Sequence, residues 1–215
     1  MIDSYRHKGL RKQLVTSVRN KGIADEKILE AIGSVPRHFF MDSSFLEFAY
    51  QDKPFPIGSG QTISQPYTVA FQTRLLEVKK GDKILEVGTG SGYQACILSH
   101  LGAIVYSIER QKKLYEKTSN LIPKLGYYVK CYFGDGYKGL PVFAPFDKIL
   151  ITAGAPVVPE ILINQLRTGG ILVSPVGSGD TQIMKKIVRL TDDEFSESDH
   201  GHFRFVPMLN NTAND

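Results

Sequence analysis

The segment Ile84-Leu85-Glu86-Val87-Gly88-Thr89-Gly90-Ser91-Gly92 joins a short apolar run to three glycines at alternate positions. The apolar run predicts a buried strand, and the residues after the last glycine predict a helix. Glycines at such a turn let the backbone approach a ligand closely, and the free N–H groups of a helix start can bind an anion. Ligands of open α/β sheets bind beyond the carboxyl ends of the strands. The segment therefore predicts a ligand site at a strand end.

Several ligands fit a glycine loop of this kind to different degrees. A dinucleotide fingerprint reads G-x-G-x-x-G, and here the third glycine comes one residue early. The phosphate-binding pattern G-x-x-x-x-G-K-[ST] is absent from this segment. Glu86 stands two residues before the first glycine, where it would repel a pyrophosphate. A carboxylate there suits a cationic ligand such as S-adenosylmethionine, whose sulfonium and ammonium groups are positive.

Polar side chains also follow the next two predicted strands. Glu109 ends the run that follows the glycine loop, and an acid at this distance can accept hydrogen bonds from both hydroxyls of a ribose. Asp135 lies between Gly134 and Gly136, where it can accept from the amino group of an adenine. Either acid could instead cap a helix. Suitable groups at three strand ends nevertheless favour an adenosine-type ligand.

The chain around the loop alternates strands with helices. Apolar runs predict strands over 83–87, 104–108, 127–133, 148–152 and 171–175. Helices are predicted over 67–78, 92–101, 110–125 and 157–167. This alternation predicts a Rossmann-like α/β fold, with a mostly parallel sheet and helices on both faces. The runs 183–190 and 202–208 predict an antiparallel pair at one edge, joined by a solvated acidic loop that holds Asp192, Asp193, Glu194, Glu197 and Asp199.

The first third of the chain has a different texture. Helices are predicted over 4–20 and 25–34, and a segment rich in proline and aromatic residues follows over 35–57. That segment is too apolar for a linker. We therefore expect residues 1–66 to form an extension that packs on the core, residues 67–215, within one compact domain.

Composition and charge exclude several classes of protein. The chain has 215 residues, 42% of them hydrophobic and 22% charged, which is ordinary for a globular domain and excludes wholesale disorder. Residues 1–22 contain six basic side chains and one acidic, so 20 of the 26 basic residues remain elsewhere against 21 of the 22 acidic ones. The net charge of +4 thus belongs to one helix face, which favours a solvated helix over an RNA-binding arm. We expect no stable nucleic-acid partner.

The cellular setting is also predicted from the sequence. No apolar run approaches a membrane span, and residues 1–12 lack the apolar core of a secretory signal. Cys96 and Cys131 lie in apolar surroundings and are expected to be unpaired thiols. No Cys/His set has the spacing of a zinc site, so no metal is expected. These features predict a cytoplasmic protein without a membrane partner.

Three segments carry a specific resemblance. They are P-F-P-I-G-S-G-Q-T-I-S-Q-P-Y over 54–67, V-P-R-H-F-F over 35–40 and the glycine loop E-V-G-T-G-S-G-Y-Q over 86–94. Together they resemble the protein-L-isoaspartate O-methyltransferase family. Matching stretches at 146–153, 169–173 and 205–208 extend the resemblance from about residue 10 to residue 209. The glycine loop alone would indicate only a class I methyltransferase, whereas the G-Q-T-I-S-Q-P-Y block is specific to this family.

The resemblance implies an activity. Members of this family transfer a methyl group from S-adenosylmethionine to the free α-carboxylate of L-isoaspartyl residues, and of D-aspartyl residues less well, and they release S-adenosylhomocysteine. The methyl ester collapses to a succinimide, part of which reopens to normal aspartate, so damaged proteins and peptides are repaired. Family members are cytosolic and usually monomeric.

The resemblance also implies roles for particular residues. Ser64 is the expected active-site residue. The expected cofactor contacts are Thr62, Ile63, Gln65, Glu86, Gly88, Gly90, Glu109, Arg110, Asp135 and Gly136. The expected substrate contacts are Gln65, Val69 and Val206. Gly154 departs from the alanine common in relatives, and the polar tail 210–215 leaves the C-terminal cofactor contacts open.

Methylation of a carboxylate agrees with the absence of a nucleophile motif from the sequence. A carboxylate is ionised at neutral pH and can attack an activated methyl group without a general base, so the absence of a G-x-S-x-G nucleophile elbow is consistent. Ser64 is then expected to orient the acceptor, and His38 to be a structural hydrogen-bonding residue. Three alternatives remain: a methyltransferase that acts on RNA, although 152–156 lacks N-P-P-Y; a nicotinamide oxidoreductase; and a binding module without activity.

Overall fold

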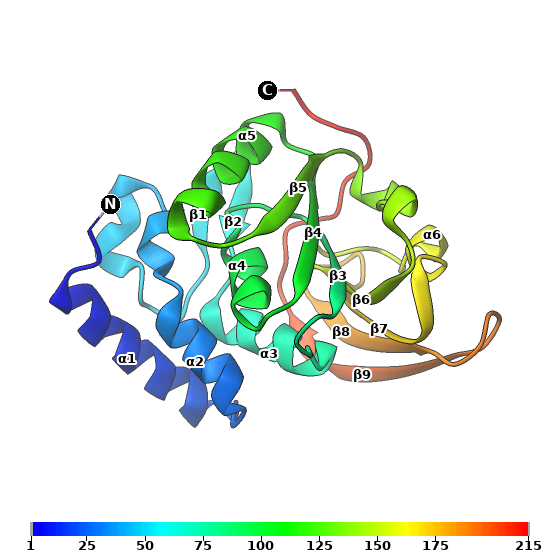
Figure 1. Cartoon of the computed structure of the whole chain (residues 1–215), viewed down its shortest axis with the longest axis horizontal. Helices are drawn as coiled ribbons and strands as arrows, with labels where there is room; N and C mark the ends of the chain where they lie inside the picture. Colours follow the sequence, from blue (N-terminus) through cyan, green and yellow to red (C-terminus); the bar gives the residue numbers. More distant parts are fainter. Residues whose placement is uncertain (1, 215) are drawn as a thin grey trace.

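A seven-stranded sheet forms the centre of the computed structural model, which describes residues 2–214 (Figure 1). Met1 and Asp215, the outer ends of the predicted extension and of the polar tail, lie outside the described residues. The strand order is β5-β4-β3-β6-β7-β8-β9; the pairs from β5 to β7 are parallel, and β8 and β9 add an antiparallel edge. The strands are β3 (Lys83–Val87), β4 (Ile104–Glu109), β5 (Val129–Phe133), β6 (Phe146–Ile151), β7 (Leu166–Val176), β8 (Gln182–Arg189) and β9 (Phe195–Phe203). The predicted fold class is confirmed.

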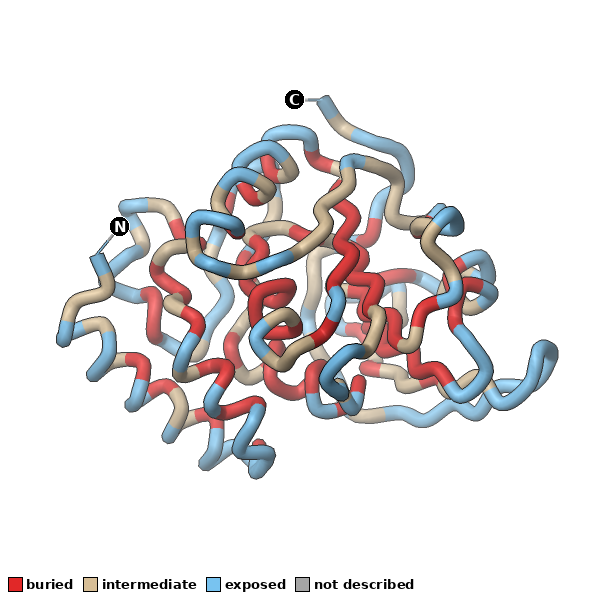
Figure 2. The backbone as a smooth tube through the Cα atoms, in the orientation of Figure 1, coloured by how far each residue is buried: buried red, intermediate tan, exposed pale blue. Residues whose placement is uncertain are grey.

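The two faces of the sheet carry different helices. The helices are α1 (Tyr5–Asn20), α2 (Glu26–Ser34), α3 (Pro66–Leu76), α4 (Tyr93–His100), α5 (Lys112–Leu121) and α6 (Glu160–Ile163). Side chains alternate along a strand, so Ile84 faces the core under α3, α4 and α5, while Leu85 faces the core under α6. Figure 2 shows the buried residues gathered along the central strands and the helices beside them.

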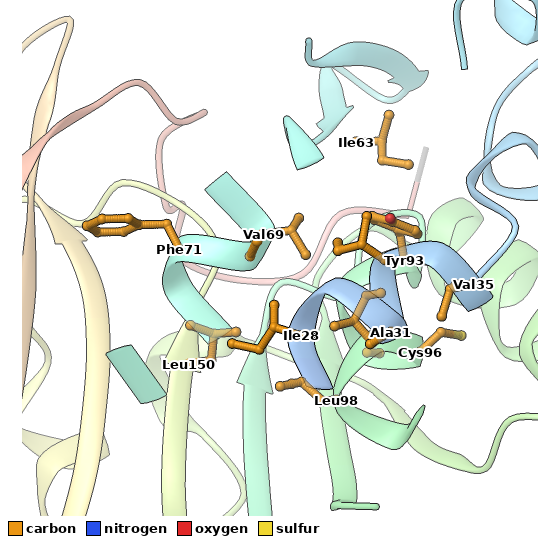
Figure 3. Packing of buried hydrophobic residues seen from close by; sticks show 14 of the residues in the cluster. Ile28, Ala31, Val35, Ile63, Val69, Phe71, Tyr93, Cys96, Leu98 and Leu150 are labelled. Carbon is orange, nitrogen blue, oxygen red and sulfur yellow. The ribbon is translucent and has the colours of Figure 1, made fainter. Parts of the chain in front are cut away.

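The N-terminal helices share the larger of these two cores. Ile28, Ala31 and Val35 of α2 and its cap lie in one cluster with Tyr93 and Cys96 of α4 (Figure 3). Full burial of an aliphatic side chain contributes ~1.5–3 kcal/mol, so several such residues anchor α2 firmly. The cluster runs without a break from α1 to the sheet. The division of this one domain into an extension, residues 1–66, and a core, residues 67–215, stays a prediction.

The antiparallel edge differs from its prediction. β8 pairs with residues 195–203, whereas the run 202–208 had been expected to form the partner strand. The acidic stretch is therefore partly a strand: Glu197 and Asp199 lie on β9 and form ion pairs with Lys185 of β8. Cross-strand charge pairs of this kind stabilise a hairpin, which the sequence pattern alone did not indicate.

Residues after β9 run beside the loop that follows β6. The N–H of Gly154 donates to the carbonyl of Val206 at 2.8 Å, and the N–H of Met208 donates to the carbonyl of Gly154 at 2.8 Å. The helix predicted over 157–167 is also shorter, because α6 spans only 160–163 and Leu166 already pairs with Phe146 in the sheet.

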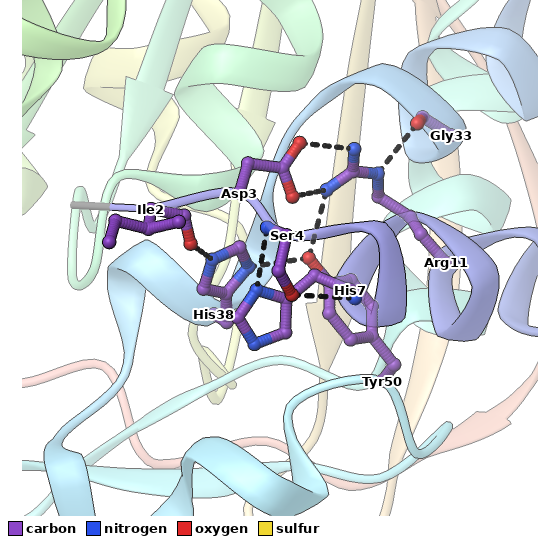
Figure 4. A network of polar contacts seen from close by, with 8 residues as sticks. All are labelled: Ile2, Asp3, Ser4, His7, Arg11, Gly33, His38 and Tyr50. Atoms are coloured by element: carbon purple, nitrogen blue, oxygen red, sulfur yellow. Dashed lines mark hydrogen bonds and ion pairs between the residues drawn. The ribbon is translucent and has the colours of Figure 1, made fainter.

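A polar network joins the start of α1 to the segment before the short strand β1 (Phe55–Gly58) (Figure 4). Both carboxylate oxygens of Asp3 accept from Arg11, which also donates to Tyr50 and to the carbonyl of Gly33. His38 lies 2.6 Å from the Tyr50 hydroxyl and stacks on His7, with ring centroids 3.9 Å apart. The predicted structural role of His38 is confirmed. The carboxylate oxygen of Asp3 and the ring nitrogens of His7 and His38 that could bind a metal ion lie within 4.8 Å of one another.

Two further features bear on the setting of the protein. Cys96 is buried and Cys131 half-buried, and both are free thiols, as predicted. Among residues 2–214, no helix is both long and apolar enough to span a membrane.

Candidate functional site

The glycine loop leaves the carboxyl end of β3 in a conformation that requires glycine. Gly88, Gly90 and Gly92 have φ angles of 99°, 52° and 85°, a region that other residues rarely adopt. A Cβ at Gly88 would lie 2.5 Å from Oγ1 of Thr152, and one at Gly92 would lie 2.6 Å from a methyl group of Thr118. The N–H of Gly88 donates to the carbonyl of Ile108, so the loop is fastened to the end of β4.

Glu109 at the end of β4 holds the loop from the other side. Its Oε2 accepts from the N–H of Gly90 and its Oε1 from the N–H of Gln111, each at 2.8 Å. Burial raises the pKa of the Glu109 carboxyl above its ordinary value, and the two N–H donors act in the opposite direction. A carboxylate oxygen can accept more than one hydrogen bond. Glu109 therefore keeps acceptor capacity for a ligand.

Glu86 lies beneath the same loop and is fully buried. Its Oε2 accepts from the hydroxyl of Ser107, which lies beside it on β4, while its Oε1 has no hydrogen-bond partner within residues 2–214. Burial raises the pKa of Glu86 to about 8. Burial of a partly unpaired carboxyl disfavours its charged form, so Glu86 is mostly protonated at neutral pH, and a cation nearby would favour its ionisation.

Asp135 follows β5 and caps a short 3-10 helix (Gly136–Lys138). Its Oδ1 accepts from the N–H of Tyr137 at 2.9 Å, and its Oδ2 accepts from the N–H of Asn211 at 3.1 Å. The C-terminal tail is thereby drawn to this strand end. Arg110 holds the same tail, because its guanidinium donates to the carbonyls of Asn210 and Asn211.

These strand ends surround a first cavity and a smaller one that adjoins it. The first cavity has about 510 Å³ of empty space, part of it open to solvent. Its lining comes from the glycine loop and the start of α4, Glu109, α3 and the segment before it, the loop after β6 and the chain after β9: Gln61, Thr62, Ile63, Ser64, Val69, Gly88, Thr89, Gly90, Ser91, Tyr93, Gln94, Glu109, Thr152, Ala153 and Val206. The adjoining cavity shares Gln61, Gly88, Glu109 and Ala153 and adds Arg110 and Gly136.

A second cavity lies on the other side of the segment before α3. It is larger, with about 1530 Å³ of empty space including open solvent. Its lining comes from the end of α1, the start of α3 and the residues that end and follow β9: Lys21, Pro54, Thr62, Ser64, Gln65, Tyr67, Thr68, Thr152, His202, Phe203, Arg204, Phe205 and Val206. Thr62, Ser64, Thr152 and Val206 line both the first and the second cavity. Ligands in the two cavities would therefore meet at these four residues.

Arg37 fixes the backbone at this junction. Its guanidinium is fully buried and donates to the carbonyls of Ala49, Lys53 and Ser64 at 2.6, 3.0 and 3.1 Å. It forms no ion pair with a carboxylate in residues 2–214, and burial lowers its pKa to about 10, so it remains a cation at neutral pH. The buried guanidinium of Arg37 thus holds the backbone of the segment that carries Ser64 through a hydrogen bond.

Comparison with known proteins identifies the family. Residues 9–213 match the family described as protein-L-isoaspartate(D-aspartate) O-methyltransferase. A protein-L-isoaspartate O-methyltransferase from Christiangramia forsetii is 62% identical over 210 residues, which cover 97% of this chain and 98% of the relative. One from Flavobacterium psychrophilum is 60% identical over the same shares. The chain belongs to the protein-L-isoaspartate O-methyltransferase family.

Solved structures of the family have the same fold. One protein-L-isoaspartate O-methyltransferase aligns with a TM-score of 0.85 at 29% identity, over 94% of this chain and 66% of that one. A putative protein-L-isoaspartate O-methyltransferase from Plasmodium falciparum, in complex with S-adenosyl-L-homocysteine, aligns with a TM-score of 0.83 at 25% identity, over 94% and 99%. This chain is accordingly an S-adenosylmethionine-dependent methyltransferase with the fold of its family.

The structure brings most of the predicted site residues of this methyltransferase together. Eight line the first cavity: Thr62, Ile63, Ser64, Val69, Gly88, Gly90, Glu109 and Val206. Arg110 and Gly136 line the adjoining cavity, and Gln65 lines the second. Glu86 and Asp135 line none of these three cavities. Glu86 lies beneath the glycine loop, and the carboxylate of Asp135 accepts hydrogen bonds from its own 3-10 turn and from the C-terminal tail. The individual roles of these residues stay predictions.

Three residues of the site, Gln61, Thr152 and Arg37, stand in sequence motifs that predicted no role for them. Gln61 belongs to the G-Q-T-I-S-Q-P-Y block and lines the first cavity and the adjoining one. Thr152 follows β6, and its hydroxyl donates to the carbonyls of Val87 and Gly88. Arg37 stands in the V-P-R-H-F-F segment. A polar residue inside an apolar, family-specific motif was the available signal for Arg37, but only the fold shows that it reaches Ser64.

Proposed function

We propose that this member of the protein-L-isoaspartate O-methyltransferase family methylates the free α-carboxylate of L-isoaspartyl residues, and of D-aspartyl residues less well, at the junction of the first and second cavities. One observation carries the assignment to this place: four residues, Ser64 among them, line both cavities. The methyl donor would occupy the first cavity, and the damaged peptide the second.

The residues of the first cavity suit S-adenosylmethionine. Glu109 retains acceptor capacity for the ribose hydroxyls, and the Gly88–Gly90 turn lets the backbone come close. The unpaired Oε1 of Glu86 lies beneath the loop, and a cationic ligand nearby would favour the ionised form of this carboxyl. Asp135 and Gly136 would meet the adenine, although Asp135 also caps its own turn. When bound, S-adenosylmethionine supplies an activated methyl group and is left as a neutral thioether.

The chain's own contribution is alignment. The acceptor carboxylate needs no proton removed, so the protein has to hold one of its oxygens in line with the methyl carbon and the sulfur. Positioning of this kind can supply ~7–11 kcal/mol. Ser64 lines both cavities, and its hydroxyl forms no hydrogen bond with another residue in 2–214, so it is free to donate to the acceptor. The hold of Arg37 on the Ser64 carbonyl keeps the backbone of that residue in place.

The junction can also exclude water. Val206 lines both cavities, and Ile63 and Val69 close the first one with apolar surface. The reaction joins an anion and a cation into neutral products, so a dry site favours it. A monomeric state, a cytoplasmic location and the absence of a metal, a membrane partner or a stable nucleic-acid partner stay predictions.

A matched peptide pair tests the proposal. One peptide contains L-isoaspartate and the other L-aspartate at the same position, and each is incubated with methyl-labelled S-adenosylmethionine. We expect label only on the isoaspartyl peptide, followed by its slow loss as methanol when the ester closes to succinimide. Equal labelling of both peptides, or of neither, would contradict the proposal. If neither peptide is labelled, a structured RNA tests the alternative acceptor.

A further inference from the structure

The walls of the second cavity carry charge of a single sign. Of its thirteen lining residues, three are basic (Lys21, His202 and Arg204), and none is aspartate or glutamate. The three come from separate elements, the cap of α1, strand β9 and the segment after it, and all three are exposed at the rim. Through Lys21, the cap of α1, one residue of the basic segment 1–22 lines this cavity.

The three rim groups are not equivalent. Lys21 forms an ion pair with Asp52, whose two carboxylate oxygens also accept from the side-chain amide of Gln65 and the N–H of Tyr67. The carboxylate of Asp52 therefore balances the charge of Lys21. Arg204 has no hydrogen bond from its side chain and no ion pair within residues 2–214, so the charge of its exposed guanidinium has no partner there. It is the permanent, uncompensated charge of the rim.

The backbone on both sides of Arg204 is fixed. Phe203 pairs with Gln182 at the end of the hairpin, the N–H of Phe205 donates to the side-chain oxygen of Gln182 at 2.9 Å, and the carbonyl of Val206 accepts from Gly154. Arg204 thus projects from an anchored chain. Val206, which lines both cavities, is two residues away, a span of about 7 Å in extended chain.

We propose that this rim, and Arg204 above all, makes the methyltransferase prefer isoaspartyl sites with an acidic side chain close by in the substrate. The inference rests on the proposed function and concerns which damaged sites it acts on. An extended substrate whose isoaspartyl carboxylate lies at the junction places a residue two positions away at about the distance of Arg204. Opposite charges there attract, and a lysine at the same place is repelled.

Peptides that differ at one position test this selectivity. Glutamate, glutamine or lysine is placed two residues before the isoaspartate in one series and two residues after it in another. The readout is kcat/KM for methyl transfer. An exposed ion pair is worth 0.2–1 kcal/mol, so in at least one series we expect about a 1.4- to fivefold preference for glutamate over glutamine, and the lowest value for lysine. The preference should be larger at about 0.01 M salt, where the Debye length is ~30 Å, than at about 1 M, where it is ~3 Å.

Variants assign the preference to the rim. Arg204→Gln should bring the glutamate-to-glutamine ratio close to one, and Arg204→Glu should reverse the order of the peptides. Arg6→Gln is the matched control. It removes the same net charge from α1, and Arg6 is 15 residues, about 22 Å of helix, from Lys21. The ratio should not change in Arg6→Gln.

Two results would overturn the inference: equal kcat/KM for the three wild-type peptides at low salt in both series, or a preference that survives in Arg204→Gln. Peptide binding followed by fluorescence anisotropy, with S-adenosylhomocysteine present, measures the same selectivity without methyl transfer. Failure of the proposed function would leave every isoaspartyl peptide unlabelled. The order of the binding constants would still decide whether the rim selects acidic neighbours.

Discussion

The first and second cavities carry charge of opposite sign. The first is lined by the carboxylate of Glu109, with Glu86 buried behind the loop, and no lysine or arginine lines it among the described residues. The second is lined by Lys21, His202 and Arg204, and no acidic residue contributes to it. A cationic methyl donor and an anionic acceptor must meet for this reaction. In the proposed function, the cationic donor would lie in the cavity lined by Glu109, the anionic acceptor would lie in the cavity with the basic rim, and the two would meet at the shared residues.

The two cavities also differ in how the chain builds them. Strand ends of one parallel sheet and their following turns supply almost half of the lining of the first cavity, so the position of Glu109 is fixed by strand order and register. The second cavity collects residues from the end of α1, the start of α3 and the chain around the end of β9. Its shape depends on tertiary packing, and it is the place where we expect substrate selectivity to vary.

The largest expected effect concerns the wall between the two cavities. Arg37→Met removes the donor to the carbonyls of Ala49, Lys53 and Ser64, and each buried acceptor left without a partner costs ~1–3 kcal/mol. We expect the free energy of unfolding, measured by urea titration, to fall by about 3 kcal/mol or more. Arg37→Lys should restore part of it. Arg19→Met, at an exposed ion pair, is the control and should cost under ~1 kcal/mol. Equal losses in the two methionine variants would contradict the role of Arg37.

A change at Glu109 should affect the first cavity alone. Glu109→Ala removes a charged acceptor, worth ~1.5–3 kcal/mol, so the Kd for S-adenosylhomocysteine should rise about 10- to 150-fold in calorimetric titrations. Peptide affinity in the second cavity should change much less. Glu116→Ala, at an exposed acid of α5, is the control. An unchanged Kd for S-adenosylhomocysteine in Glu109→Ala would remove Glu109 from the cofactor site.

A change at Ser64 should lower the rate of methyl transfer between the two ligands. We expect Ser64→Ala to lower kcat at least about tenfold, because one hydrogen bond that orients the acceptor is worth ~1.4 kcal/mol or more. The Kd for S-adenosylhomocysteine should stay within about twofold, as the expected loss lies in alignment. Ser44→Ala, at an exposed serine, should leave both quantities unchanged. An unaltered kcat in Ser64→Ala would exclude Ser64 from the mechanism.

The last prediction concerns the buried acid behind the first cavity, whose effect depends on pH. The pKa of Glu86 is about 8 in the folded protein and about 4.5 in the unfolded chain, so the folded state holds an extra proton between these pH values. The contribution of Glu86 to stability is fully present below pH 4.5 and declines as pH rises to 8, by at most about 1.4 kcal/mol per pH unit. Above pH 8 the decline stops.

Urea unfolding of Glu86→Gln without cofactor measures this contribution. The amide cannot ionise, so the stability of the variant relative to wild type should increase from pH 5 to pH 8 and then level off. Glu116→Gln, which changes an exposed acid, should follow wild type at every pH. Parallel curves for Glu86→Gln and wild type would show that Glu86 is ionised in the free protein.

Local patterns predicted the first cavity far better than the second. Gly88 and Glu109 each follow or end a strand that could be identified from an apolar run, and parallel strands bring their carboxyl ends to one edge. By contrast, the run 202–208 was expected to be a strand, because alternating aromatic residues resemble one. In the structure β9 ends at Phe203, and the following residues turn along Gly154 to line both cavities.

The family, the parallel sheet and the chemistry of the strand ends could be predicted from the sequence, because strand periodicity, glycine turns and family motifs are local properties of the chain. The folded structure was needed to show that Ser64 lines two cavities, that Arg37 donates to its carbonyl, and that Lys21 and Arg204 lie at one rim. Those relations join residues 27 to 183 positions apart. They arise from packing of whole elements on the sheet, which no local pattern encodes.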